Sequence, residues 1–126
     1  MSKRNENELE LNGEIYVKKS SVNTNQLAPK VDGLPLVLIR GYGSGVQYGY
    51  LSNKNGCEVT LLNSRRIWSW NKATETSEIA VNGIDVANSK VTIVCPEKTI
   101  TDAIEIISIT EKASINLLNQ PVWTKA

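Results

Sequence analysis

The apolar residues between Leu36 and Trp70 follow the two-residue period of β-strands, and turn-forming residues interrupt them. The pattern predicts four consecutive antiparallel strands, at residues 36–39, 46–51, 57–62 and 65–70, with turns at 41–45, 53–56 and 63–64. The first strand, Leu36-Val37-Leu38-Ile39, is apolar at every position, so we expect both of its faces to be buried.

The second and fourth of these strands have faces of distinct character. One face of the second strand carries Val46, Tyr48 and Tyr50. Gly49, in the middle of that strand, indicates a sharp bend or a close approach of two backbones. One face of the fourth strand carries Arg65, Ile67 and Ser69, and the other carries Arg66, Trp68 and Trp70.

After Trp70 the sequence predicts two short helices. Residues 74–82 can start at a Thr or Ser cap and stop at Gly83. The large apolar residues there, Ile79 and Val81, are few for a core face, so we expect this helix at the edge of the sheet. The second helix begins after a Thr110 cap and runs through Leu118, with Ile115 and Leu118 on one face.

Two further strands lie between and beside these helices, at residues 90–95, ended by Pro96, and at residues 101–109. Short, strongly bent antiparallel strands favour a small barrel over an open sheet. We therefore expect a mainly β (β-rich α+β) fold, with a barrel-like sheet of the Sm or SH3 type and two short helices. The alternative is a two-layer α+β sandwich with the last helix across one face of the sheet.

The first third of the chain has a different character. Residues 1–8 are polar and typical of a disordered tail. Residues 9–17 alternate around Asn12-Gly13, which predicts a β-hairpin that docks on its own domain or reaches to a neighbouring subunit. Residues 18–34 have the composition of a linker, and residues 35–126 form the single β-rich domain.

Composition excludes several classes of function. The net charge of the 126 residues is +1, which gives no strong attraction to nucleic acid or to an anionic membrane, and no apolar run is long enough to span a membrane. No signal peptide opens the chain, so a cytoplasmic protein is the default expectation. The chain has no histidine, the commonest general base and metal ligand, so we expect neither metal nor cofactor and no enzyme. Cys57 and Cys95 are expected to be buried and free.

The glycine-rich turn Gly41-Tyr42-Gly43-Ser44-Gly45 has two interpretations. Backbone N–H groups of such loops can bind phosphate. However, a strand follows the turn where a phosphate loop requires a helix, and the glycine spacing fits neither common motif. A tight hairpin turn is therefore favoured, and we assign Gly41, Gly43, Gly45 and Gly49 structural roles.

The strongest candidate for a binding surface is a mixture of arginine and aromatic side chains. Its members are Arg65, Arg66, Trp68, Trp70, Tyr42, Tyr48 and Tyr50. Such mixtures bind phosphates, stack on bases and dominate protein–protein interfaces. The structural alternative is that a tryptophan belongs to the core and that the arginines form a solvated edge.

Three further residues are assigned structural roles. Asp102 and Glu105 are three positions apart, so on a strand they would point to opposite faces and make a poor acid–base pair. Asp102 is instead expected in a turn, and Glu105 is expected to form an ion pair with Arg65 or Arg66. Trp123, close to the end of the chain, is expected to lie in a groove of its own domain or of a partner.

The chain resembles a family of small tailed-phage and prophage proteins known only as a domain of unknown function. The resemblance covers about residues 36–124. It rests on Ile39-Arg40-Gly41-Tyr42-Gly43-Ser44-Gly45-Val46, Gly49-Tyr50-Leu51, Gly56-x-Glu58-Val59-x-Leu61, Ser64-Arg65-Arg66-Ile67-Trp68-x-Trp70, Ala103-Ile104-Glu105-Ile106-Ile107, Thr110-Glu111-Lys112-Ala113 and Pro121-Val122-Trp123. Ser64 replaces an expected alanine, and Ser108-Ile109 replaces an expected Pro-Cys, so no role is expected for that cysteine. The resemblance implies a phage origin and no particular activity.

Two functions are consistent with these observations. In the first, an accessory protein acts in the cytoplasm of the infected bacterium and engages or sequesters a host protein or a nucleotide-like small molecule through the Arg/Trp/Tyr patch. In the second, the protein is a structural or assembly component of the virion and uses its N-terminal hairpin and C-terminal tail for subunit contacts. In either case we expect a homo-oligomer. Nucleic-acid binding is less favoured, because the net charge is near neutral.

Overall fold

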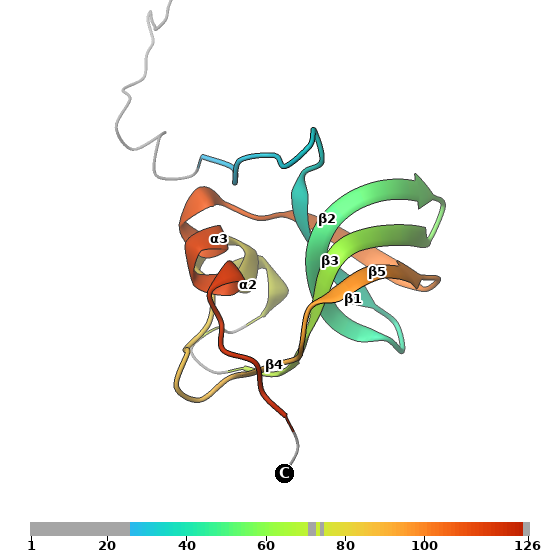
Figure 1. The fold of residues 1–126 in the computed structure, drawn as a ribbon. Coiled ribbons are helices and arrows are strands. Elements are labelled where there is room, and N and C mark those ends of the chain that lie inside the picture. Colours follow the sequence, from blue (N-terminus) through green and yellow to red (C-terminus); the bar gives the residue numbers. More distant parts are fainter. Residues whose placement is uncertain (1–25, 71–72, 74, 125–126) are drawn as a thin grey trace, which may run out of the picture.

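The computed structural model describes residues 26–70, 73 and 75–124, and these form a bent six-stranded antiparallel sheet with two helices on one side (Figure 1). The strands are β1 (Leu36–Gly41), β2 (Gly45–Asn55), β3 (Glu58–Ser69), β4 (Lys90–Val91), β5 (Cys95–Ile100) and β6 (Ala103–Ser108), and the helices are α2 (Thr76–Asn82) and α3 (Glu111–Leu118). The predicted mainly β fold with two short helices is confirmed. The predicted tail and hairpin, and residues 18–25 of the predicted linker, lie outside the described residues.

The sheet curls because two consecutive strands pair with opposite parts of it. The strand order is β4-β3-β2-β1-β6, and β5 pairs with β3. A short turn joins β5 to β6, so the sheet must bend until the edge of β3 approaches the edge of β1. The sheet is barrel-like but does not close.

The predicted turn at residues 63–64 is wrong, because β3 runs without interruption from Glu58 to Ser69. Asn63 has a φ of 52°, a conformation that asparagine tolerates better than most residues. The pairing shifts there by one residue, since Tyr48 faces Arg65 while Tyr50 faces Leu62. Such a β-bulge reverses which face of the strand each later side chain occupies.

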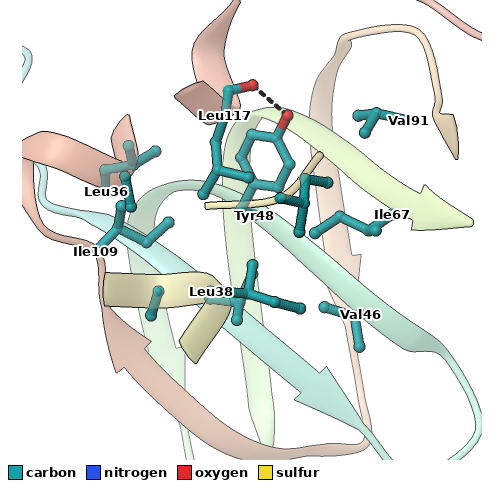
Figure 2. Close-up of a cluster of buried hydrophobic side chains, with 12 residues drawn as sticks. Leu36, Leu38, Val46, Tyr48, Ile67, Val91, Ile109 and Leu117 are labelled. Atoms are coloured by element: carbon teal, nitrogen blue, oxygen red, sulfur yellow. Dashed lines mark hydrogen bonds between the residues drawn. The ribbon is translucent and has the colours of Figure 1, made fainter. Parts of the chain in front are cut away.

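Two apolar cores lie on the two sides of the sheet. The first core lies between the sheet and the helices, and Figure 2 shows its labelled members Leu36, Leu38, Val46, Tyr48, Ile67, Val91, Ile109 and Leu117. The second fills the inside of the curled sheet and consists of Val37, Ile39, Val59, Leu61, Ile100 and Ala103. The alternating residues of β1 enter both cores, which confirms the predicted burial of its two faces.

The predicted strand at 90–95 is also wrong. The structure has the two-residue strand β4, followed by three residues outside any strand, and β5 then starts at Cys95 and contains Pro96. Pro96 has no Cα partner on β3, because the pairing passes from Cys95–Ser64 to Glu97–Leu62. Proline, which lacks an N–H group, is therefore accommodated opposite the bulge.

Helix α2 is capped by Glu75 and not by the predicted Thr or Ser, and it packs differently from the prediction. Helix α2 ends at Gly83, whose φ is 82°, as expected. It lies in the first core and not at the edge of the sheet, because Ala80 joins Ile79 in full burial. Thr110 caps α3 as predicted, through a hydrogen bond that its side chain accepts from the amide of Ala113. The buried face of α3 contains Ala113 and Leu117, which leaves the side chains of residues 115 and 118 exposed.

The two cysteines are free but not buried. Cys57 is exposed in the turn between β2 and β3, and Cys95 is half-buried at the start of β5. The prediction of burial was wrong because Cys57 falls in the turn and not on the apolar face that continues with Val59. Neither thiol contributes to the apolar cores.

Candidate functional site

Four side chains from three parts of the chain form a continuous stack on the surface. The rings of Trp68 on β3 and Trp123 near the C-terminus stack with centroids 5.8 Å apart and planes inclined by 22°. The guanidinium carbon of Arg66 lies 5.9 Å from the Trp68 ring centroid. The Nζ atom of Lys90 lies 5.1 Å from the Trp123 ring centroid. We call Arg66, Trp68, Trp123 and Lys90 the aromatic ladder.

The β-bulge and the short strand β4 position this ladder. Beyond the bulge, Ile67 points into the first core, so its neighbours Arg66 and Trp68 point away from that core. The guanidinium group of Arg66 lies against Gly45, where an added Cβ atom would be only 3.0 Å from Nη2. Lys90 pairs with Ser69 across β4 and β3, which places it beside Trp68.

Trp123 reaches the ladder through main-chain contacts. Its N–H group donates a hydrogen bond of 2.8 Å to the carbonyl oxygen of Val91. Val122 forms a parallel β-bridge with the same residue. The C-terminal segment thus runs past β4, as Figure 1 shows, and brings the second indole onto the first.

The ladder combines exposed aromatic surface with positive charge. Trp68 is 56% exposed, although an indole of this size is usually well buried. No carboxylate of the described residues forms an ion pair with Arg66 or Lys90. Each exposed cation–π contact is worth about 0.5–1 kcal/mol. The arrangement therefore places two cations beside two stacked indoles at this surface.

The structure separates Arg65 from its neighbour Arg66. The Arg65 side chain is only 4% exposed. It donates hydrogen bonds to main-chain oxygens of Thr92 (2.7 Å), Gln120 (2.7 Å) and Pro121 (3.3 Å). Its donors are thus directed at its own chain and not at solvent.

The remaining aromatic residues of the predicted patch do not join the ladder. Tyr48 is buried, its hydroxyl donates a hydrogen bond to the carbonyl oxygen of Leu117, and burial raises the pKa of Tyr48 to about 12 (Figure 2). Trp70 packs against the first core, and its Nε1–H donates to the carbonyl oxygen of Ala73 at 3.2 Å. Tyr42 is 88% exposed in the first hairpin turn.

The glycine-rich turn is held by a carboxylate from this chain. Asp102 accepts hydrogen bonds from the amides of Gly43 (2.6 Å) and Ser44 (3.1 Å) and from the Ser44 hydroxyl (2.6 Å). The Ser44 hydroxyl, followed by the Gly43 amide, holds the pKa of Asp102 below its usual range. These amides are therefore not free for a phosphate. The expected turn position of Asp102 and the hairpin interpretation are both confirmed.

The predicted partner of Glu105 is wrong. Its carboxylate accepts a hydrogen bond of 2.9 Å from Nε of Arg40, not from Arg65 or Arg66, and another of 3.1 Å from the Thr76 hydroxyl. The bond from Arg40 is the main cause that lowers the pKa of Glu105. The cause of the error is the antiparallel register, which places Arg40 directly opposite Glu105. A groove of about 330 Å³ with a mixed polar and apolar lining adjoins the pair. Its lining consists of Arg40, Val46, Trp70, Glu75, Thr76 and Glu105.

An apolar groove of about 330 Å³ lies beside α3, away from the ladder. Tyr50, from the predicted patch, is half-buried in its wall. The other lining residues are Ala28, Pro29, Val31, Glu111, Ser114, Ile115, Leu118 and Asn119. Ile115 is 64% exposed there, so this groove is a second candidate surface for contacts.

A comparison with known families identifies the family of the chain. The model of a domain of unknown function, DUF6948, matches residues 34–117, about two thirds of the chain. The chain belongs to this family. No curated protein and no solved structure matches it significantly. The expected membership in a family of unknown function is confirmed, whereas the phage origin stays a prediction.

The DUF6948 match contains three of the four ladder residues, and Trp123 lies beyond its last residue, Leu117. Among the described residues, no helix is long and apolar enough to cross a membrane. Within the same residues, no three His, Cys, Asp or Glu side chains are grouped to hold a metal ion.

Sequence reasoning missed Lys90 and the pairing of Trp68 with Trp123. Both indoles were noticed, but no local pattern links residues so far apart in the chain. The basic residue that opens a short strand beside Trp68 gave no periodic signal. Only the register of β3 with β4, and the return of the C-terminal segment along Val91, bring these side chains together.

Proposed function

We propose that this DUF6948 protein is a non-enzymatic accessory protein of a bacteriophage or prophage. It acts in the cytoplasm of the infected bacterium, where it engages a host protein through the aromatic ladder. The resemblance of its Gly-Ser-Gly-Val, Arg-Arg-Ile-Trp and Ala-Ile-Glu-Ile segments to phage proteins supports the origin. The observation that carries the function is the exposed stack of Trp68 on Trp123 between two cations.

The geometry of the stack favours a protein partner over a nucleotide-like ligand. The two indoles already contact each other at 5.8 Å, so a base cannot enter between them unless they separate. Arg66 and Lys90 lie over the rings and hinder stacking of a base on the same faces. Ring edges and charges are left for the partner. Tryptophan and arginine are the residues most enriched at protein–protein hot spots.

The charge of the ladder indicates the kind of surface that would bind there. Two cations without carboxylate partners among the described residues favour a partner with acidic side chains around an apolar centre. Their contribution would be largely to the association rate and would weaken with salt. The indoles would supply the contact area that determines the dissociation rate.

The test compares matched variants in capture from a host lysate followed by affinity measurement with the purified partner. Trp68→Ala should reduce the affinity at least tenfold, since removal of a hot-spot residue typically costs about 2 kcal/mol or more. Tyr42→Ala, which removes an aromatic ring that is 88% exposed on another turn, is the matched control and should bind as the wild type does. Equal affinity of the Trp68→Ala variant and the wild type would contradict the proposal, as would a nucleotide that co-purifies and is lost in that variant.

A second candidate function is a structural role in the virion. The observation that favours it is the apolar groove beside α3, where Ile115 and Leu118 are exposed and suited to a contact between copies of the chain. In contrast, Trp123 packs on its own chain, which does not favour an interlocking C-terminal arm. Peptide maps of purified particles and the native mass of an Ile115→Lys variant test this role. A monomeric wild type that is absent from particles would exclude it.

A further inference from the structure

The segment that carries Trp123 has little anchorage of its own. We call residues 121–124 the strap. Pro121, Val122 and Thr124 are exposed, and only Trp123 is half-buried. Among the residues that the structure describes, the last one that belongs to an apolar core is Leu117. The only side-chain anchor of the strap is therefore the half-buried Trp123, and main-chain contacts supply the rest of its attachment.

Those contacts converge on one buried cation and one short strand. The Arg65 guanidinium donates to the carbonyl oxygens of Gln120 and Pro121, at the point where the strap begins. Its Nε donates to the carbonyl oxygen of Thr92, directly after β4. Further along, the amide of Trp123 donates to the oxygen of Val91. Arg65 thus ties the strap to the same strand that Trp123 follows.

The bonding of Arg65 is unusual for a buried charge. Such a charge is normally paired with a carboxylate, because removing it from water without compensation is costly. No carboxylate of the described residues pairs with Arg65, and main-chain oxygens surround its guanidinium instead. Arginine suits this arrangement because its rigid fork presents several donors at once, whereas the ammonium of lysine is compact and flexible.

From these contacts we infer that Arg65 is a positioning residue for the aromatic ladder. It holds the strap against β4 and so places Trp123 on Trp68. The ladder is a site of two parts, one built on β3 and β4 and one supplied by the strap. When the hydrogen bonds of Arg65 are lost, the strap detaches from β4 and Trp123 separates from Trp68, while the sheet and helices stay folded. The role in partner binding rests on the function proposed above, but the geometric claim does not.

The test uses the full chain with Arg65→Lys, and Arg40→Lys serves as the matched control. Arg40 also uses its Nε in a hydrogen bond, but to Glu105 on β6. Two measurements report on the strap without any partner: the exciton couplet of the stacked indoles in circular dichroism, and hydrogen exchange of the Trp123 amide. In Arg65→Lys we expect the couplet to disappear and that amide to exchange at least about tenfold faster. Amides of β1 should keep their wild-type rates, and Arg40→Lys should change neither measurement.

A second variant, a chain that ends at Gln120 as a C-terminal amide, separates positioning from a general structural role, because the amide places no terminal carboxylate beside the Arg65 guanidinium. This chain should keep the wild-type thermal midpoint to within a few degrees and should lack the couplet. Arg65→Lys should lower the free energy of unfolding, measured with denaturant, by less in the shortened chain than in the full chain. In the shortened chain Arg65 no longer binds the Pro121 oxygen, and there is no strap for it to position. An equal cost in both chains would overturn the inference, as would a failure of Arg65→Lys to fold while the shortened chain folds.

The outcomes also distinguish this inference from the proposed function. If Arg65→Lys folds and keeps both the couplet and a protected Trp123 amide, the inference fails regardless of what the ladder binds. If the strap detaches as described but Trp68→Ala still binds the partner normally, the proposed function fails and the role of Arg65 stands. If both hold, Arg65→Lys should lower the affinity for the partner by about as much as deletion of the strap does.

Discussion

Tyr48 and Arg65 face each other directly across β2 and β3, and both side chains end on main-chain oxygens near the C-terminus. The Tyr48 hydroxyl donates to Leu117, the residue that completes the buried face of α3. The Arg65 guanidinium donates to Gln120 and Pro121, where the chain leaves that helix. One cross-strand pair thus fixes both the end of the last helix and the beginning of the strap. These two polar side chains connect the interior of the fold to the proposed binding surface.

The first prediction concerns Tyr48→Phe at neutral pH. This change removes a buried hydroxyl that bonds the Leu117 oxygen, with little change in side-chain volume. We expect a loss of about 1 kcal/mol in the free energy of unfolding. Urea unfolding measures this loss, and Tyr42→Phe, on the exposed turn, is the control that should leave the free energy unchanged.

The same pair of proteins gives a second, pH-dependent prediction. Burial raises the pKa of Tyr48 to about 12 from an ordinary 10.0, whereas the charge of Arg65 acts in the opposite direction. The stabilisation linked to the neutral phenol is therefore complete below about pH 10 and is lost as the pH rises through about 12. A shift of this size corresponds to about 2–3 kcal/mol. The difference in stability between wild type and Tyr48→Phe should fall over this alkaline range. A constant difference would contradict the assignment.

The sequence predicted the parts of the fold that depend on local periodicity. The full apolar run of Leu36 to Ile39 identified a strand buried on both faces, and the Thr110 cap located the start of α3. Arg66 and Trp68 share a face as predicted, because alternation within a strand is local, but Trp70, predicted on the same face, packs against the first core. The predictions that were wrong concern contacts between residues far apart in the sequence. The Asn63 bulge resembles a turn in sequence, and only pairing with β2 and β5 keeps β3 continuous.

The candidate site illustrates the same limit. Residues adjacent in sequence, Arg65 and Arg66, look equivalent, yet one is buried and the other is part of the ladder. The pleat of β3 separates them, and which one faces the core depends on the bulge. Tyr48 and Trp70 could not be assigned to the core from composition, since aromatic residues are common both in cores and at interfaces. The contribution of Trp123 depends on contacts between the C-terminal segment and the strands β3 and β4.

A third prediction tests the bulge. Asn63 has a φ of 52°, which is strained for β-branched residues and costs nothing for glycine. We expect Asn63→Val to lower the free energy of unfolding by about 1–2 kcal/mol. Asn63→Gly should change it by only about a few tenths of a kcal/mol. Because Asn63 is exposed, the comparison involves little change in burial. Equal changes in unfolding free energy for the two substitutions would show that Asn63 is not required for its backbone conformation.

The fourth prediction concerns Asp102 and acid. Its carboxylate accepts three hydrogen bonds from the Gly43-Ser44 turn, and these lower its pKa. The stabilisation is therefore present above the ordinary pKa of the carboxyl and is lost as the pH falls through the lowered value. Asp102→Ala should lower the thermal midpoint at neutral pH, and the difference from the wild type should shrink in strong acid. Glu97→Ala, which removes an exposed carboxylate from the neighbouring strand, is the control.

The last prediction concerns Gly49, where the sequence indicated a close approach of two backbones. A Cβ atom at this position would lie 3.0 Å from the carbonyl oxygen of Leu62 and 3.1 Å from the Cα atom of Ser64. Both are backbone atoms at the β3 bulge, so they cannot move aside as the end of a flexible side chain would. We expect Gly49→Ala to cost about 1–3 kcal/mol by overpacking.

The matched control for this change is Gly43→Ala. There the new Cβ atom would meet only Oδ2 of Asp102, at an ordinary contact distance of 3.5 Å. Denaturant unfolding of both variants at neutral pH gives the comparison. Equal losses of unfolding free energy in Gly49→Ala and Gly43→Ala would contradict this prediction. They would mean that the bulge shifts to accept the added methyl group. The register that directs Arg65 inward and Arg66 outward would then be less firmly fixed than these distances imply.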